Sequence, residues 1–269
     1  MAVDTSGVLS PEQFRTQYAE LAQEVADRAT AETKLAKWLK TKQGKYGASS
    51  GWTLWTPTLQ EANNLTLRKY IKRKAAECDG LQRGEIRAGS TRHGNDEELP
   101  GAEDFMDRSG LTLTHYGDDQ QWVAWEECDQ VGCTPDGLIF CRSVMLPWLT
   151  DLLENVTLVF EQKNNDTIEA YEEFAGMTDG SQLLQVNYKY WIQCQHQMMC
   201  LKSPAAVFQA RYSRTESGEA DMCWFLVPRD DEFIERHGAR LKRAVKERDA
   251  QREVRAGRRL VDLTSIITQ

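Results

Sequence analysis

The sequence lacks the features that would place this protein in a membrane, in a disulfide-rich secreted class or in a zinc-binding class. No stretch approaches the roughly 20 apolar residues that a membrane-spanning helix needs. The N-terminal segment MAVDTSGVLSPEQF has neither the basic start nor the apolar run of a signal peptide. The cysteines (positions 78, 128, 133, 141, 194, 200 and 223) are odd in number and form no C-x-x-C pair, so we expect reduced core thiols. These absences together predict a cytoplasmic protein.

An excess of positive charge is also lacking. The formal net charge is −8, so a nucleic-acid role would require basic groups gathered on one face of the molecule. The chain of 269 residues is 41% hydrophobic, which is enough to fill the core of one domain. We predict a single domain made of an N-terminal helix over 1–37, a core over 38–228 and a charged helix over 229–269.

Residue spacing predicts an α/β fold. Apolar residues at helical spacing and short runs of Thr, Val, Trp and Phe between turn residues indicate helices and strands, respectively. Helices are expected over 10–36, 56–77, 94–106, 183–201 and 230–269, and strands over 111–117, 121–127, 134–140, 157–163, 205–213 and 221–228. The four strand-like runs before 164 are typical of a meander that forms the sheet. We expect loops over 40–51 and 78–101, a helical insertion or an irregular loop over 144–156, and a mobile stretch after Glu169.

Three chemistry-bearing residues lie on two of the predicted strands. Asp136 sits in a Pro-Asp-Gly turn that leads into one strand, and Glu161 and Lys163 alternate on another, so that their side chains share a face. Two carboxylates and the backbone carbonyl of Gln162 would supply the hard oxygen ligands that Mg²⁺ prefers. Such a site suits phosphodiester hydrolysis, in which Lys163 would orient or deprotonate the attacking water or offset charge on the phosphate. The alternative is an ordinary turn beside a surface ion pair.

Other polar and aromatic groups have two interpretations each. His93 and His196 fit structural histidines better than metal ligands, because neither has zinc-ligand spacing. The aromatic cluster (Trp122, Trp125, Trp148, Tyr188, Tyr190 and Trp191) fits core packing better than a base-stacking wedge. The Arg-rich C-terminal helix either contacts phosphates or forms a solvated face with ion pairs, and KYIKRK at 69–74 is a more compact basic run.

Five segments resemble the lambda-exonuclease-like, YqaJ-type viral recombinase branch of the PD-(D/E)XK nucleases. They are WLKTKQGKYGAS at 38–49, HGNDEELPGAEDF at 93–105, TPDGL at 134–138, EQK at 161–163 and YWIQCQHQM at 190–198. Their order matches that of the family, whose motifs include a G-x-x-x-E-x-x-A helix and a Y-x-x-Q-x-Q-x-x-M helix. The resemblance implies a PD-(D/E)XK restriction-endonuclease-like fold, with a central mixed sheet flanked by helices.

The resemblance also implies roles for individual residues. Asp136, Glu161 and the Gln162 carbonyl would bind Mg²⁺, for which Mn²⁺ would substitute, and Lys163 would activate water. Glu98 would contact metal-linked water or a second metal, and Gln193 would hold the nucleophile or the scissile phosphate. Lys42 and Ser49 match positions that grip a 5′ phosphate, and Glu126 matches a further family acid.

The implied activity is Mg²⁺-dependent 5′-to-3′ hydrolysis of linear double-stranded DNA that leaves 3′ single-stranded tails, in a phage-type recombination system. The family forms rings around DNA, most often homotrimers, and works with a single-strand annealing protein. This sequence departs from the family in the long 139–158 segment, in Asn164 and Asn165 where Cys-Pro is usual, and in Lys42 where arginine is common. The alternatives are another PD-(D/E)XK endonuclease, a single-strand exonuclease, or a catalytically silent DNA-binding or inhibitor protein.

Overall fold

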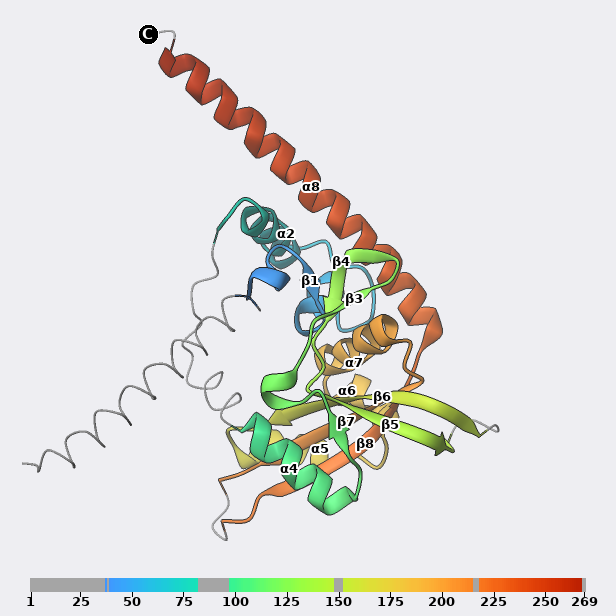
Figure 1. Ribbon diagram of the computed structural model, residues 1–269. Helices are drawn as coiled ribbons and strands as arrows, with labels where there is room; N and C mark the ends of the chain where they lie inside the picture. Colours follow the sequence, from blue (N-terminus) through green and yellow to red (C-terminus); the bar gives the residue numbers. More distant parts are fainter. Residues whose placement is uncertain (1–36, 38, 82–96, 148–151, 215–217, 268–269) are drawn as a thin grey trace, which may run out of the picture. The chain divides into compact units, whose positions relative to one another are not determined.

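The computed structural model describes residues 37, 39–81, 97–147, 152–214 and 218–267 (Figure 1). The chain divides into two units, 1–42 and 43–269. In the first unit, residues 37 and 39–42 are helical, and the Thr41 hydroxyl donates to the Lys37 carbonyl over 3.0 Å. The second unit contains both sheets described below. The predicted division into an N-terminal helix over 1–37, a core over 38–228 and a charged helix over 229–269 stays a prediction.

A mixed sheet lies at the centre of the second unit. Its strands follow the order β2-β5-β6-β7-β8, with bounds Leu113–Thr114, Gly137–Val144, Leu153–Asn164, Ala205–Tyr212 and Asp221–Pro228. β6 and β7 are parallel, whereas the other neighbours pair antiparallel. Helices cover the sheet, so the predicted α/β fold with a central mixed sheet flanked by helices is confirmed (Figure 1).

The two faces of β6 pack against different helices. Val159 and Glu161 face α7 (Tyr188–Leu201), whereas Phe160 and Gln162 face α4 (Glu98–Ser109). This alternation is the period-2 geometry of a strand that is buried on both sides. Near its carboxyl end, β6 therefore directs the Glu161 side chain toward α7 and the Gln162 side chain toward α4.

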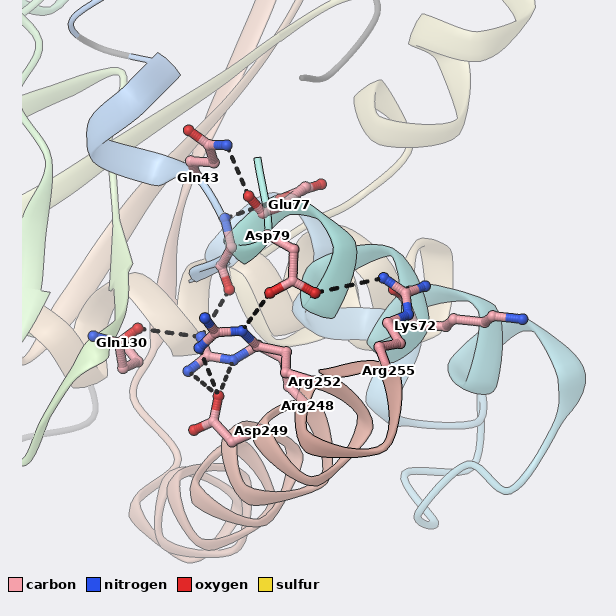
Figure 2. Close-up of polar contacts among 10 residues, drawn as sticks. Gln43, Lys72, Glu77, Asp79, Gln130, Arg248, Asp249, Arg252 and Arg255 are labelled. Atoms are coloured by element: carbon pink, nitrogen blue, oxygen red, sulfur yellow. Dashed lines mark hydrogen bonds and ion pairs between the residues drawn. The ribbon is translucent and has the colours of Figure 1, made fainter. Parts of the chain in front are cut away.

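A second, smaller sheet and several helices surround this centre. The small sheet has the order β1-β4-β3, with bounds Tyr46–Gly47, Cys128–Cys133 and Val123–Trp125. The remaining elements are η1 (Ala48–Leu54), α2 (Leu65–Cys78), η2 (Gly117–Asp119), α5 (Ile168–Ala175), η3 (Gly180–Gln182), α6 (Leu183–Val186) and α8 (Asp231–Ile267). The long α8 runs beside α2, as Figures 1 and 2 show.

Caps and glycines define the ends of the helices. The Asn64 side chain accepts from the Leu67 N–H over 2.9 Å and starts α2, which is why the helix predicted over 56–77 begins at 65. Asn187 caps α7 in the same way and separates it from α6, so the single helix predicted over 183–201 is two. α4 ends at Gly110, whose φ of 70° lies in the left-handed region.

Several sequence-based expectations were wrong. In the described part of the 144–156 segment, Val144 and residues 153–156 belong to the paired strands β5 and β6. The stretch predicted to be mobile after Glu169 contains the rest of α5, as far as Ala175, and then η3. The expected loop over 40–51 contains β1 and the start of η1, and the predicted loop over 78–101 ends in the first turn of α4.

The predicted meander was wrong in its pairing. The strand expected over 121–127 corresponds to β3, which lies in the small sheet and not in the central one. It pairs with β4, a strand that was not predicted from the sequence. The strands predicted over 205–213 and 221–228 and the long C-terminal helix are confirmed. The helix predicted over 10–36 and His93 lie outside the described residues. In the part of the chain that the structure describes, no helix has the length and apolar character needed to cross a membrane.

Candidate active site

Asp136 extends the β5–β6 ladder with its side chain. Its backbone N–H donates to the Phe160 carbonyl over 3.1 Å, one residue before β5 begins. The Gln162 N–H, two residues further along β6, donates to Asp136 Oδ2 over 2.9 Å. The carboxylate therefore takes the place of a backbone acceptor at the point where the ladder ends, which fixes its position beside the carboxyl end of β6.

Glu161 is fully buried and accepts hydrogen bonds on both carboxylate oxygens. Gln193 Nε2 donates to Oε1 and Gln197 Nε2 donates to Oε2, each over 2.6 Å. Lys163 Nζ forms an ion pair with Oε1 and lies 5.1 Å from the centre of the Tyr190 ring. The predicted convergence of Glu161, Lys163 and Gln193 is thus present in the structure.

The charges of the site act on one another. Burial raises the pKa of Asp136, the nearby carboxylates of Glu161 and Glu98 raise it further, and Lys163 partly offsets them. Burial lowers the pKa of Lys163, but Glu161 and Asp136 oppose this effect and the net shift is upward. Three carboxylates and one ammonium group therefore share this part of the molecule.

Glu98 reaches the site because α4 is anchored on the sheet. The Gln162 side chain donates to the Glu98 carbonyl over 2.6 Å, and Gln209 Nε2 donates to the Gly101 carbonyl over 3.1 Å. A Cβ atom at Gly101 would lie 2.5 Å from Gln162 Oε1, so a side chain there would displace the Gln162 amide that holds α4 on the sheet. The close packing places the first residue of α4 next to the carboxyl end of β6.

The oxygen donors at this end of β6 fit a hard divalent cation. Among the described residues, no cluster of three or more His, Cys, Asp and Glu side chains is arranged as a metal site. The donor set would instead be Asp136, Glu161 and the Gln162 carbonyl, which points to the same strand edge as the Gln162 N–H that binds Asp136. When ionised, the carboxylates of Asp136, Glu161 and Glu98 outnumber the one ammonium group of Lys163, and a cation would neutralise this excess negative charge.

One predicted residue, Glu126, is not brought to this cluster. Glu126 is exposed and pairs with Lys202, which ends α7 nine positions after Gln193, or about 13 Å along the helix axis. Ser49 is exposed on η1. Lys42 lies in the helical segment of the first unit.

The histidine expected to be structural is part of a buried chain of hydrogen bonds. Trp55 Nε1 donates to His237 Nδ1 over 2.8 Å, His237 Nε2 lies 3.0 Å from His196 Nδ1, and His196 Nε2 lies 3.1 Å from the Gly132 carbonyl. Because the indole can only donate, both rings carry their proton on Nε2 and donate in the same direction. His196 is therefore a core residue, as predicted.

Several basic residues of α8 are engaged in ion pairs and hydrogen bonds (Figure 2). Arg248 is buried and donates to the Gly44 carbonyl over 2.9 Å and to Gln130 Oε1 over 3.2 Å. Arg252 and Arg255 reach across to α2, where they pair with Asp79. These contacts favour the ion-paired interpretation of the C-terminal helix, and they tie the segment before β1 to α2 and α8.

The remaining candidates also divide between core and surface. Trp125 and Trp191 are buried, which confirms core packing for them, and Trp148 lies outside the described residues. In KYIKRK, Lys74 is buried against Glu77, so only part of this run faces solvent. All seven cysteines are free thiols. The predicted core position holds for the buried Cys133, Cys194 and Cys200, whereas the other four are partly exposed.

Gln197 is the contact residue that the motif did not single out. It lies four positions after Gln193, on the same face of α7, and this i, i+4 spacing is the signal that could have identified it. Gln195, the second glutamine of the motif, points away from the site and bonds to Pro228 and Asp230.

Known proteins with this fold include exonucleases. An alkaline exonuclease (LHK-Exo) from Laribacter hongkongensis has a TM-score of 0.63 at 18% identity, covering 85% of this chain and 99% of that chain. Its structure in complex with dAMP has a TM-score of 0.62 at 19% identity, with the same coverage. A phage-related exonuclease from Haemophilus somnus 129PT has a TM-score of 0.54 at 16% identity, covering 77% of this chain and 94% of that chain.

These structures establish the PD-(D/E)XK fold that the sequence resemblance implied. No curated protein gives a significant match. The sequence model of one family, described as the YqaJ-like viral recombinase domain, matches residues 37–206, which is more than half of the chain. The chain therefore belongs to the YqaJ-like viral recombinase domain family.

Proposed function

We propose that this protein is a metal-dependent 5′-to-3′ exonuclease of linear double-stranded DNA, which leaves 3′ single-stranded tails during phage-type recombination. Membership of a viral recombinase domain family and a fold shared with exonucleases support a nuclease. The observation that carries the proposal is the meeting of Asp136, Glu161 and Lys163 at the carboxyl end of β6. Three such groups together suit phosphodiester hydrolysis.

Asp136, Glu161 and the Gln162 carbonyl would hold Mg²⁺, with Mn²⁺ able to substitute. The bound cation would supply Lewis-acid stabilisation of the charge that develops on the phosphate. The Lys163 side chain is 21% exposed, and its Nζ would hold the attacking water or a phosphate oxygen by hydrogen bonds. Glu98 approaches the same cluster and would orient metal-linked water.

Gln193 can contact the substrate through its side-chain oxygen. Nε2 donates one hydrogen bond to Glu161, and Oε1 would accept a hydrogen bond from the attacking water. Lys42 and Ser49 would contact the 5′ phosphate, and exposed Ser49 is accessible for this role. A lysine would bind phosphate as a point charge, without the fork geometry of arginine.

The proposed assembly is a homo-oligomeric ring, most simply a trimer, that works with a single-strand annealing protein in the host cytoplasm. A ring would reconcile a net charge of −8 with DNA binding, because basic groups lining a central hole would leave the outer surface negative. Multi-angle light scattering of the purified protein would give the number of subunits directly.

The activity is tested on linear duplexes that carry either a 5′ phosphate or a 5′ hydroxyl, with a label at one end of one strand. We expect Mg²⁺-dependent release of mononucleotides from the 5′ end, inhibition by EDTA, and no degradation by the matched Asp136→Asn variant. Cleavage of circular DNA would indicate an endonuclease instead, and preference for single strands would indicate a single-strand exonuclease. A duplex left intact in Mg²⁺ would favour a catalytically silent DNA-binding protein.

A further inference from the structure

We propose that Gln197 is a positioning residue, which sets the orientation of the Glu161 carboxylate and thereby the affinity of the site for its cation. The inference rests on the proposed metal-dependent function. It assigns to Gln197 a role that neither the motif nor the implied ligand set contains. Three observations support it: the pairing of Gln197 with Gln193, its unsatisfied side-chain oxygen, and the number of donors around Glu161.

The first observation is that two amides one helical turn apart grip the two oxygens of one carboxylate. Gln193 Nε2 binds Oε1 and Gln197 Nε2 binds Oε2, both over 2.6 Å. A single hydrogen bond would leave the carboxylate free to rotate about its Cγ–Cδ bond. Two donors on the rigid α7 fix the plane of the carboxylate relative to the sheet.

The second observation is the contrast between Gln197 and its neighbour Gln195, since both are fully buried on α7. Both ends of the Gln195 amide are satisfied: Nε2 donates to the Pro228 carbonyl over 2.8 Å, and Oε1 accepts from the Asp230 N–H over 2.9 Å. Gln197 Oε1 is buried without a hydrogen-bond partner among the described residues.

A buried amide oxygen without a partner destabilises the folded protein. The amide cannot turn round to satisfy it, because Oε1 would then face the negatively charged Glu161. The hydrogen bond from Nε2 to Glu161 is therefore the contact that accounts for a glutamine at this position.

The third observation is the number of hydrogen bonds that Glu161 already accepts. A carboxylate offers about four acceptor positions, two on each oxygen. Among the described residues, Lys163 and Gln193 use both positions of Oε1, and Gln197 uses one on Oε2. The position that is left lies on Oε2, the oxygen that Gln197 holds, so Gln197 determines where this position points.

The test compares Gln197→Met with Gln195→Met in the full-length protein. Methionine preserves side-chain length and approximate volume but removes the amide. Mn²⁺ affinity is measured by isothermal titration calorimetry without DNA, Tm by calorimetry without metal, and kcat and KM on a linear duplex. Gln197→Asn, whose amide is one methylene shorter, is the second variant in case the methionine variant does not fold.

Loss of an outer partner of a metal-ligating carboxylate typically weakens metal binding or activity about 10-fold or more. We therefore expect Gln197→Met and Gln197→Asn to weaken Mn²⁺ binding about tenfold and to lower kcat by a similar factor, with KM for DNA within twofold of wild type. Gln195→Met should lower Tm and leave Mn²⁺ affinity within twofold of wild type.

Unchanged Mn²⁺ affinity in the Gln197 variants, or an equal loss in Gln195→Met, would overturn the inference. A wild-type protein that binds Mn²⁺ but does not degrade DNA would refute the nuclease alone, since the comparison of affinities still decides the role of Gln197. A wild-type protein that binds no Mn²⁺ would overturn both.

Discussion

Acidification should destabilise this protein through the buried pair His196 and His237. Burial lowers the pKa of His196 to about 4, partly opposed by its bond to the Gly132 carbonyl, and burial together with His196 lowers the pKa of His237. A histidine whose pKa is lower in the folded than in the unfolded protein binds its proton preferentially after unfolding. Its contribution to stability is therefore present above the unfolded pKa of about 6.5 and is lost as the pH falls towards 4.

The magnitude for His196 follows from the shift. A decrease from 6.5 to about 4 corresponds to roughly 3.4 kcal/mol in total, of which about 2 kcal/mol falls between pH 7 and pH 4.5. The His196→Gln variant retains a donor for Gly132 and an acceptor for His237 but does not titrate. Carboxylates contribute about equally to both proteins, so the difference between the two pH profiles isolates His196.

Urea unfolding at constant ionic strength between pH 7 and pH 4.5 measures this difference. We expect the wild-type free energy of unfolding to fall by about 2 kcal/mol more than that of the variant over this range. Parallel profiles would show that His196 titrates normally in the folded protein, and the reasoning from burial would then be wrong.

Three further predictions concern the proposed activity. Lys163→Ala should retain duplex binding, measured by fluorescence anisotropy, but lose at least about 100-fold in kcat, because Nζ is the cation next to Glu161; cleavage at the wild-type rate would exclude this lysine from the mechanism. Lys42→Ala should reduce the preference for 5′-phosphorylated over 5′-hydroxyl ends, measured as a ratio of initial rates, and an unchanged ratio would remove Lys42 from the phosphate site. Glu126→Ala should leave both the cleavage rate and the midpoint of urea unfolding close to those of wild type, because its ion pair with Lys202 is exposed. Loss of cleavage would place Glu126 in the site after all.

The parts of the fold that depend on local patterns were predictable from the sequence. Alternation along β6 placed Glu161 and Lys163 on one face. The i, i+4 spacing of Gln193 and Gln197 likewise indicates a shared face of α7, although no role for Gln197 was predicted from it. The strands at 205–213 and 221–228 were evident because each contains a β-branched residue and two aromatic residues, which favour strands. Local periodicity is sufficient to predict a helix or strand, and which of its residues share a face, when the pattern lies within that one element.

Long-range pairing was not predictable in the same way. The strand at Cys128–Cys133 contains Asp129, Gln130 and Gly132, which disfavour a strand by propensity. Its pairing with β1 and β3 decides its conformation, and a Cβ at Gly132 would lie 2.4 Å from the Val123 carbonyl. The contact of Gln162 with Glu98 joins residues 64 positions apart, for which neither segment carries a local signal.

The β5–β6 ladder is long enough that changes at its Val144 end should not affect Asp136 at the other end. The ladder runs from Gly137 opposite Phe160 to Val144 opposite Leu153, so Val144 lies about 26 Å along the strand from Asp136. A one-residue slip would turn Glu161 away from α7 and expose its buried neighbours, and every pair in the ladder opposes such a slip. Met145, just past the end of the ladder, has an exposed side chain and is therefore a suitable place to attach a fluorophore without altering the Asp136 end of the strands.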